Sequence, residues 1–203
     1  NELEKVNRNY PNRFPSGGIT FVPNQMNMFS LTYSRRIQRP NYQSLNPFVS
    51  QIDELSFRQG NPFLQPQYTD NVKLSHTFAY RFTTSVSYSH IEDFSAEVTD
   101  TLGATRSFIT TKNVANQDII SLGLSIPLSI KKWWNVYLGI DGFYSEYTAK
   151  DDKFTEVTQK TLSVFAQNAF LLKGGFKFEI SGWFSSPSVW GGTSITKSMG
   201  SLN

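Results

Sequence analysis

Apolar and polar residues alternate along most of this 203-residue chain. The clearest case is the segment DIISLGLSIPLSI (118–130), in which every second residue from Ile120 to Ile126 is apolar and the residues between them are serine or glycine. Alternation with a period of two is typical of a β-strand with one apolar face. No stretch of useful length has the spacing of an amphipathic helix, and the pattern therefore predicts an all-β fold.

The alternation predicts about eight strands, and a ninth that begins near Ile195. Short turns and long polar loops follow one another between these strands, and Pro127 marks the end of the fifth. Short turns at one end and long loops at the other are typical of outer-membrane barrels, so we expect an antiparallel up-and-down meander. The predicted strands are 13–21, 26–36, 68–80, 83–98, 106–126, 134–148, 156–171 and 175–186; the turns are 22–25, 81–82, 131–134 and 171–175; the loops are 37–67, 99–106 and 149–156.

Aromatic residues make up 15% of the chain, and several lie beside the predicted short turns. Rings at the edge of an apolar band are the girdle expected at a membrane interface. The opposite faces of the strands carry small residues, which suit a lumen wider than that of a filled eight-stranded barrel. The rings are Tyr80, Phe82, Trp133, Trp134, Phe170 and Phe176; the small residues are Ser85, Ser87, Ser89, Ser121, Gly123 and Ser125.

Composition excludes several other classes of protein. Cysteine is absent, there are two histidines, and no phosphate-binding glycine motif or nucleophile motif occurs, so we expect neither an enzyme nor a metal or other cofactor. The net charge of +3 is spread thinly, which argues against nucleic acid. No run approaches the roughly 20 apolar residues of a membrane helix, and the first residues do not have the pattern of a signal peptide.

Two local motifs remain. Arg35 and Arg36 end a predicted strand at the outer rim, and Arg39 follows it. Guanidinium groups placed there can meet lipid phosphates, carboxylates of neighbouring strands or an anionic ligand. The tripeptide Asn-Pro-Phe occurs at 46–48 and again at 61–63, and Asn-Pro is expected to start a turn in each copy. Recognition of this tripeptide by a partner domain is the alternative.

The segment from Leu31 to Phe78 resembles the barrel domain of TonB-dependent receptor-like outer-membrane proteins of the Bacteroidetes. The residues that carry the resemblance are Ser34-Arg35-Arg36, Arg39-Pro40-Asn41-Tyr42, Leu45 to Phe48 and Gly60 to Pro66. A second match, in the right order, lies in SGWFSSPSVWGG (181–192) and KSMGSLN (197–203).

This resemblance implies a large transmembrane barrel of about 22 strands, with a plug inside and a TonB system as partner. Residues 1–203 are then expected to be a partial outer-membrane barrel domain of eight or nine strands, without the plug. Unpaired strand edges and an apolar surface would favour oligomers if such a segment were isolated in water.

We therefore expect a non-catalytic segment of an outer-membrane transport or receptor barrel, located in the outer membrane and in contact with its lipid. The ligand is a small molecule, a glycan or a peptide that the sequence does not specify. Two alternatives stay open: a self-standing small barrel for anchoring or adhesion, and a soluble β-sandwich binding module. The candidate ligand-binding residues are Arg36, Arg39, Tyr42, Phe48, Phe57, Trp183 and Trp190.

Overall fold

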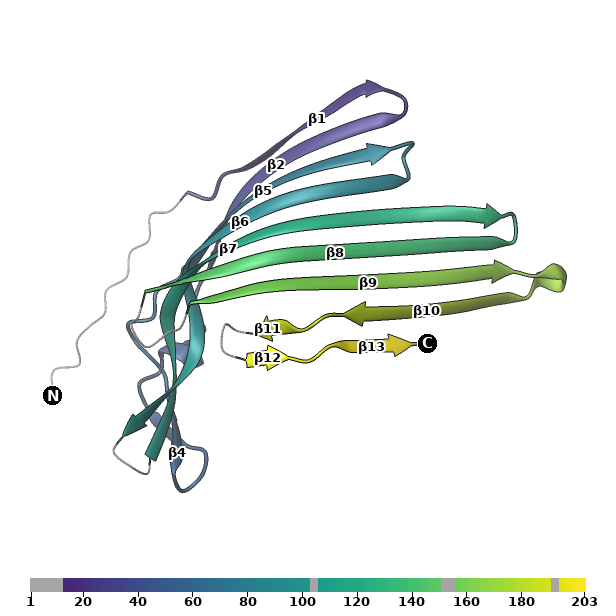
Figure 1. Ribbon diagram of the computed structural model, residues 1–203. Coiled ribbons are helices and arrows are strands. Elements are labelled where there is room, and N and C mark those ends of the chain that lie inside the picture. Colours follow the sequence, from purple (N-terminus) through teal and green to yellow (C-terminus); the bar gives the residue numbers. More distant parts are fainter. Residues whose placement is uncertain (1–12, 103–105, 151–155, 191–193) are drawn as a thin grey trace.

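The structure, a computed structural model, describes residues 13–102, 106–150, 156–190 and 194–203. Eleven of the strands in these ranges form one sheet whose main path is an antiparallel meander. Figure 1 shows this sheet as a curved, open surface with short turns at one end. The path is β1 (Ser16–Asn24), β2 (Asn27–Gln38), β5 (Gln67–Phe78), β6 (Phe82–Leu102), β7 (Arg106–Lys131), β8 (Trp134–Ala149), β9 (Val157–Leu171), β10 (Lys177–Ser185) and β13 (Met199–Leu202).

Smaller elements lie off this path. Between β2 and β5 the chain forms a single-turn helix and a hairpin, and β4 of that hairpin pairs in parallel with β7. A separate two-stranded sheet follows β10, and a 3-10 turn joins β9 to β10. These elements are α1 (Tyr42–Leu45), β3 (Val49–Gln51), β4 (Ser56–Gln59), η1 (Lys173–Gly175), β11 (Ser188–Trp190) and β12 (Ser194–Thr196).

One face of the sheet is apolar and open to its surroundings. Cross-strand partners form continuous rows, and the six apolar side chains of one such row are 46–74% exposed. An exposed apolar face of this extent in a single sheet indicates contact with lipid rather than a packed core. The row is Ile19, Leu31, Leu74, Val86, Leu122, Gly142 and Leu162.

The opposite face is polar and has small side chains. The adjacent row of partners consists mostly of serine and threonine, with Asp141 as its largest side chain. The strand alternation predicted from the sequence is therefore confirmed, including the small residues at Ser85 and Gly123. The row is Thr20, Ser30, Ser75, Ser85, Gly123, Asp141, Ser163 and Ser185.

Aromatic rings gather at the short-turn end of the apolar face. Trp134, Phe170 and Phe178 are cross-strand partners on three neighbouring strands, with ring centroids 5.9 and 6.1 Å apart. The indole N–H of Trp134 donates to Asn168 at 3.1 Å, which satisfies the polar end of this ring. Rings that pair an apolar body with a satisfied polar tip suit a membrane–water interface.

Three tyrosines bound the apolar face toward the long loops. Tyr33, Tyr88 and Tyr144 share one row of partners, and each hydroxyl donates to a carboxylate. Beyond that row, Arg35 forms a 3.0 Å ion pair with Asp70. Between Trp134 and Tyr144 the apolar face of β8 covers about 11 residues, which is the length of a tilted transmembrane strand. The hydroxyl bonds are Tyr33 to Asp70 (2.6 Å), Tyr88 to Asp118 (2.5 Å) and Tyr144 to Glu146 (3.4 Å).

The predicted meander of eight to nine strands is confirmed, but three details are wrong. Instead of a loop at 99–106, β6 runs to Leu102 and β7 starts at Arg106, so this hairpin extends past its neighbours. Pro127 lies within β7, opposite Tyr137, rather than at its end. β6 starts at Phe82 and pairs with β7 only as far as Ser125, so β7 has a free edge beside Pro127. A residue without an N–H is tolerated at such an edge.

The third wrong detail concerns the ninth strand. Ile195 lies in β12, which pairs with β11 in the separate two-stranded sheet, and β13 is the strand that pairs with β10. The soluble sandwich is also contradicted, because the fold is one extended sheet rather than two sheets packed face to face. Among the described residues, no helix is long and apolar enough to cross a membrane.

The contrast between the two faces gives a first prediction. Leu124→Arg places a charge in the middle of the apolar face of β7, and we expect it to destabilise the membrane-inserted protein by about 2–4 kcal/mol. Ser121→Arg, on the polar face of the same strand, is the matched control and is expected to cost far less. Urea titration of the protein folded into lipid vesicles measures both. Equal losses would mean that the apolar face does not meet lipid.

Candidate functional site

The chain between β2 and β5 is a folded unit rather than a loose loop. Asn41 caps α1 by accepting a hydrogen bond from the Ser44 N–H at 2.7 Å, and the Asn46 N–H closes the helix on the Tyr42 carbonyl oxygen at 3.0 Å. An asparagine side chain at this position satisfies an N–H that a helix leaves without a partner. A helix of four residues is held here by its caps.

Both Asn-Pro-Phe tripeptides form the same turn. The side-chain oxygen of Asn46 accepts from the Phe48 N–H at 3.1 Å, and that of Asn61 accepts from the Phe63 N–H at 3.0 Å. Such bonds close an asparagine turn, so the prediction that Asn-Pro starts a turn is confirmed in both copies. The two turns are joined through Gly60, whose N–H donates to the Asn46 carbonyl oxygen at 2.9 Å.

Gly60 lies where the chain after β4 crosses the C-terminal end of α1. A Cβ at this position would overlap the Asn46 carbonyl oxygen, and it would lie 2.7 Å from the carbonyl oxygen of Gln43. These neighbours are backbone atoms of a capped helix and cannot move aside easily. Only glycine allows α1 and β4 to approach this closely.

The β3–β4 hairpin is closed by Asp53. Its carboxylate accepts a hydrogen bond from the Leu55 N–H at 2.9 Å, and this bond lowers the pKa of the Asp53 carboxyl. The carboxylate is therefore charged at neutral pH, and its hydrogen bond to the Leu55 N–H stabilises the turn.

β4 then attaches this unit to the extended β6–β7 hairpin. Residues Ser56 to Arg58 pair in parallel with 107–109 of β7, on the edge that β8 leaves when it ends at Ala149 opposite Ala115. The Phe57 ring stacks on Phe108 with centroids 5.4 Å apart. A strand edge that would otherwise be open is thus covered by the chain itself.

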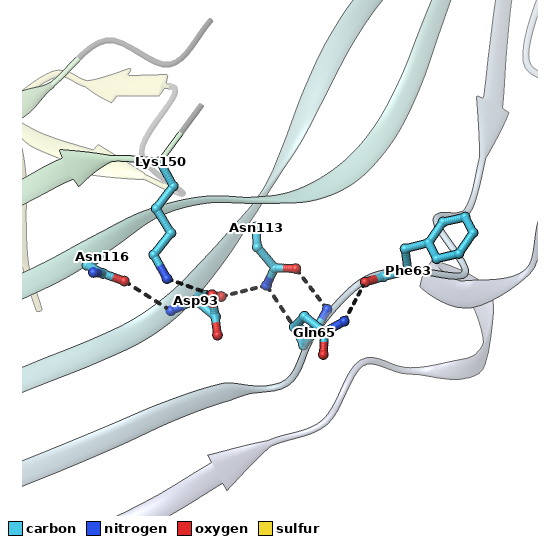
Figure 2. Close-up of polar contacts among 6 residues, drawn as sticks. All are labelled: Phe63, Gln65, Asp93, Asn113, Asn116 and Lys150. Carbon is cyan, nitrogen blue, oxygen red and sulfur yellow. Dashed lines mark hydrogen bonds and ion pairs between the residues drawn. The ribbon is translucent and has the colours of Figure 1, made fainter. Parts of the chain in front are cut away.

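Asn113 of β7 fastens the loop at a second point. Its side-chain oxygen accepts from the Gln65 N–H at 2.8 Å, and its amide nitrogen donates to the Gln65 carbonyl oxygen at 3.1 Å. The Gln65 side chain in turn donates to the carbonyl oxygen of Phe63 (Figure 2). The Asn113 amide thus pairs with both backbone groups of one residue, as a neighbouring strand would.

The same amide reaches the bulge in β6. Asn113 also donates to the Asp93 carbonyl oxygen at 2.7 Å, where Asp93 has a positive φ of 58° and the register of β6 shifts. Lys150, just after β8, donates to the Asp93 carboxylate at 2.7 Å (Figure 2). The segment before β5, the bulge of β6 and the end of β8 are therefore joined at Asn113 and Asp93.

A small core supports this network. Among the described residues, the hydrophobic cluster of buried side chains consists of Ala96, Val114, Ala115 and Tyr147, and the Phe94 ring packs against Tyr147 at 5.2 Å. Leu64 is only 2% exposed, so the loop also has a buried anchor of its own. We call the whole unit the loop platform: residues 39–66 together with residues 94–102 and 106–114.

The loop platform carries a polar groove of about 500 Å³. It lies between α1, the β3–β4 hairpin and the β6–β7 hairpin, and an ion pair of 3.0 Å joins Arg58 to Glu97 at its wall. Amide and hydroxyl side chains form most of the rest, with Phe48 as the aromatic ring. A smaller hollow of about 240 Å³ beside it is lined by Arg39 and Leu64.

The structure brings together some of the candidate residues predicted from the sequence. Phe48 lines the groove, Arg39 lines the neighbouring hollow, and Phe57 belongs to the strand that attaches the platform. Tyr42 begins α1 and is 77% exposed. These four residues belong to the same folded unit, and their role in ligand binding stays a prediction.

The other candidates lie elsewhere. Arg36 is an exposed residue of β2 opposite Thr69. Trp183 is in β10, where its cross-strand partners are Phe165 and Ser201, and β8 and β9 separate this strand from β7. The backbone of Trp190 lies in β11, while its side chain is outside the described residues.

Sequence reasoning missed the residues that build the platform, above all Gly60 and Asn113. Gly60 was marked by its place before the second Asn-Pro-Phe and by the resemblance in Gly60 to Pro66, but its role in packing was not predicted, and nothing in the pattern marked Asn113. In the described ranges, no three His, Asp or Glu side chains gather as a metal site. The groove of the platform presents amide and hydroxyl groups beside the Arg58–Glu97 ion pair.

An antiparallel meander with an exposed apolar face between aromatic borders defines the class of transmembrane β-barrel proteins. The family model described as the outer membrane protein beta-barrel family matches residues 1–203, and the chain belongs to this family. It is accordingly a protein of the outer membrane, in contact with membrane lipid. None of the curated proteins compared with the chain matches it.

Gly60→Ala tests the crossing in the platform. We expect the variant to insert in the membrane normally but to expose 37–67 to protease, because the added methyl group overlaps backbone atoms. Gly17→Ala is the matched control, since no atom lies within 4 Å of a Cβ at Gly17. Limited proteolysis of the inserted protein, with the cut sites mapped by mass spectrometry, is the measurement. Unchanged cleavage would contradict the crossing.

Asn113→Ala tests the second attachment. Loss of the two hydrogen bonds between the Asn113 side chain and Gln65 is expected to weaken docking of the loop by about 1–3 kcal/mol, and thus to speed amide exchange at Gln65. Gln65→Ala serves as the control, because it removes only the side-chain bond to Phe63 and leaves the backbone bonds to Asn113. Hydrogen exchange followed by mass spectrometry reads out 61–67. Equal exchange in both variants would show that Asn113 does not hold the loop.

Proposed function

We propose that the chain is part of an uptake receptor of the TonB-dependent type, in which the loop platform receives the ligand. The observation that carries this proposal is the order of the platform. Its helix is capped by Asn41, and residues 39–66 are held to the β6–β7 hairpin by the pairing of β4 and by the Asn113 side chain, among other contacts. Loops that only solvate a barrel rim do not need such order. A pre-organised surface lowers the entropy cost of binding.

The polar face of the sheet supports passage of a ligand. Its serine and glycine rows leave room, whereas a narrow barrel fills its interior with large side chains. The resemblance in 31–78 and 181–203 adds the expectation of a plug and of energy coupling through TonB. Both belong to the proposal.

A non-catalytic role is also part of this proposal. Four charged side chains of the platform are paired with one another: Arg58 lies 3.0 Å from Glu97, and Lys112 lies 3.5 Å from Asp100. Asp53 accepts the hydrogen bond that closes its turn. Carboxylates that are exposed or engaged in this way are poor acid–base groups.

Deletion of the gene that encodes this chain, in its native host, tests the proposal. We expect growth to be lost on one class of sole nutrient, supplied in turn as oligosaccharides, peptides, chelated iron or corrinoids. Removal of TonB should produce the same loss, because uptake against a gradient needs energy coupling. Complementation with the intact gene is the control.

Two results would contradict the proposal. Uptake that continues without TonB would leave a passive pore, and normal growth of the deletion strain on every nutrient would favour anchoring or adhesion. The second result can be checked directly by comparing the attachment of deletion and parent cells to surfaces.

A further inference from the structure

The groove of the loop platform has the chemistry of a neutral, hydroxyl-rich ligand. Its single pair of opposite charges, Arg58 and Glu97, is internally balanced at 3.0 Å. Most of the remaining lining consists of amide and hydroxyl side chains, such as Thr110 and Thr111. A volume of about 500 Å³ is within the range of small-molecule sites. The lining therefore favours neither a strongly charged ligand nor a purely apolar one.

Three side-chain amides on the groove each have one of their two polar atoms, the oxygen or the nitrogen, hydrogen-bonded within the protein. These bonds fix the orientation of the amides. The side-chain oxygens of Asn41 and Asn46 accept backbone N–H groups, at 2.7 and 3.1 Å. The amide nitrogen of Gln59 donates to the Pro47 carbonyl oxygen at 2.9 Å. In the described contacts this leaves two amide donors and one carbonyl acceptor without a partner. A ligand that both donates and accepts hydrogen bonds would satisfy all three.

The ion pair adds a second polar element. Arg58 and Glu97 are 54% and 57% exposed, so each keeps atoms available to a ligand. A guanidinium group presents a planar fork of donors, and a carboxylate accepts at two oxygens. Adjacent hydroxyl groups on a ring match both geometries.

Phe48 supplies the apolar element. Its side chain is 79% exposed although its turn is ordered by the bond to Asn46. The face of an aromatic ring carries partial negative charge, and it attracts the C–H groups on the flat side of a sugar ring. An exposed ring on an ordered turn, beside amides with groups left to bond, is a combination that suits a saccharide.

From these features we infer that the groove binds a neutral oligosaccharide, with Phe48 stacking on one sugar ring and with Asn41, Asn46 and Arg58 bonding to hydroxyl groups. This inference rests on the proposed receptor function, whose ligand class it names. A peptide is the competing occupant, because β3 pairs only with β4 in the described sheet and could accept another strand.

The test is a binding measurement on the complete protein in detergent, which does not depend on transport. The probes are fluorescent hexasaccharides of glucose, galactose, mannose and xylose in α and β linkages, and fluorescent alanine- and serine-rich decapeptides as the peptide probe. We expect at least one hexasaccharide to bind saturably and to be displaced by its unlabelled form. Phe48→Ala and Arg58→Gln should each weaken this binding about tenfold or more.

Phe63→Ala is the matched control, because Phe63 follows the other Asn-Pro, is 58% exposed and lies outside the groove lining. It should bind the hexasaccharide as the unchanged protein does. Binding of no hexasaccharide, tighter binding of the decapeptides, or equal effects of Phe48→Ala and Phe63→Ala would each overturn the inference. Saccharide binding without TonB-dependent growth would instead refute the transport role and leave the groove assignment standing.

Discussion

The structure depends on the need of every backbone N–H and C=O group in the hydrocarbon layer to find a partner within the protein. The meander meets this need by pairing consecutive strands, and β7, with 26 residues, is the strand with the most partners. It pairs with β6 on one edge and, along its length, with β8 and then β4 on the other. Where β8 ends, side chains take over the role of a neighbouring strand, as the Asn113 amide does for Gln65. Strand pairing thus continues from the membrane region into the loop platform, where side chains supply part of it.

Hydrogen bonds from side chains also explain how the platform can be ordered with a small hydrophobic core. The buried cluster that supports it contains two alanines, one valine and one tyrosine, far less than a soluble domain would use. Asparagine and glutamine side chains compensate, because each amide can donate and accept at once. Amides that cap a helix or close a turn at one end present a fixed group at the other. In this chain the residues that order the loop and those proposed to recognise the ligand are largely the same.

The sequence predicts the part of the fold in which each strand has one apolar and one polar face. From Ile120 to Ile126 the alternation is complete, and the strand, its partners and both faces follow from it. It fails for 99–102, where both faces of the hairpin are outside the apolar band and no alternation is required. Phe48 and Arg39 could be predicted as loop candidates because rings and guanidinium groups recognise ligands. Asn113 could not, since its role comes from contact with Gln65, which lies 48 residues away in the chain.

The pairing of β4 with β7 also orders the assembly of the protein in time. β4 ends at Gln59, yet the edge that it needs begins at Arg106, after the whole β5–β6 hairpin and the extension of β6. Docking of 39–66 on β7 therefore requires that β5, β6 and the start of β7 are in place. Closing so long a loop is slow compared with local hairpin formation. The loop platform is thus expected to form late, after the strands that hold it are in place.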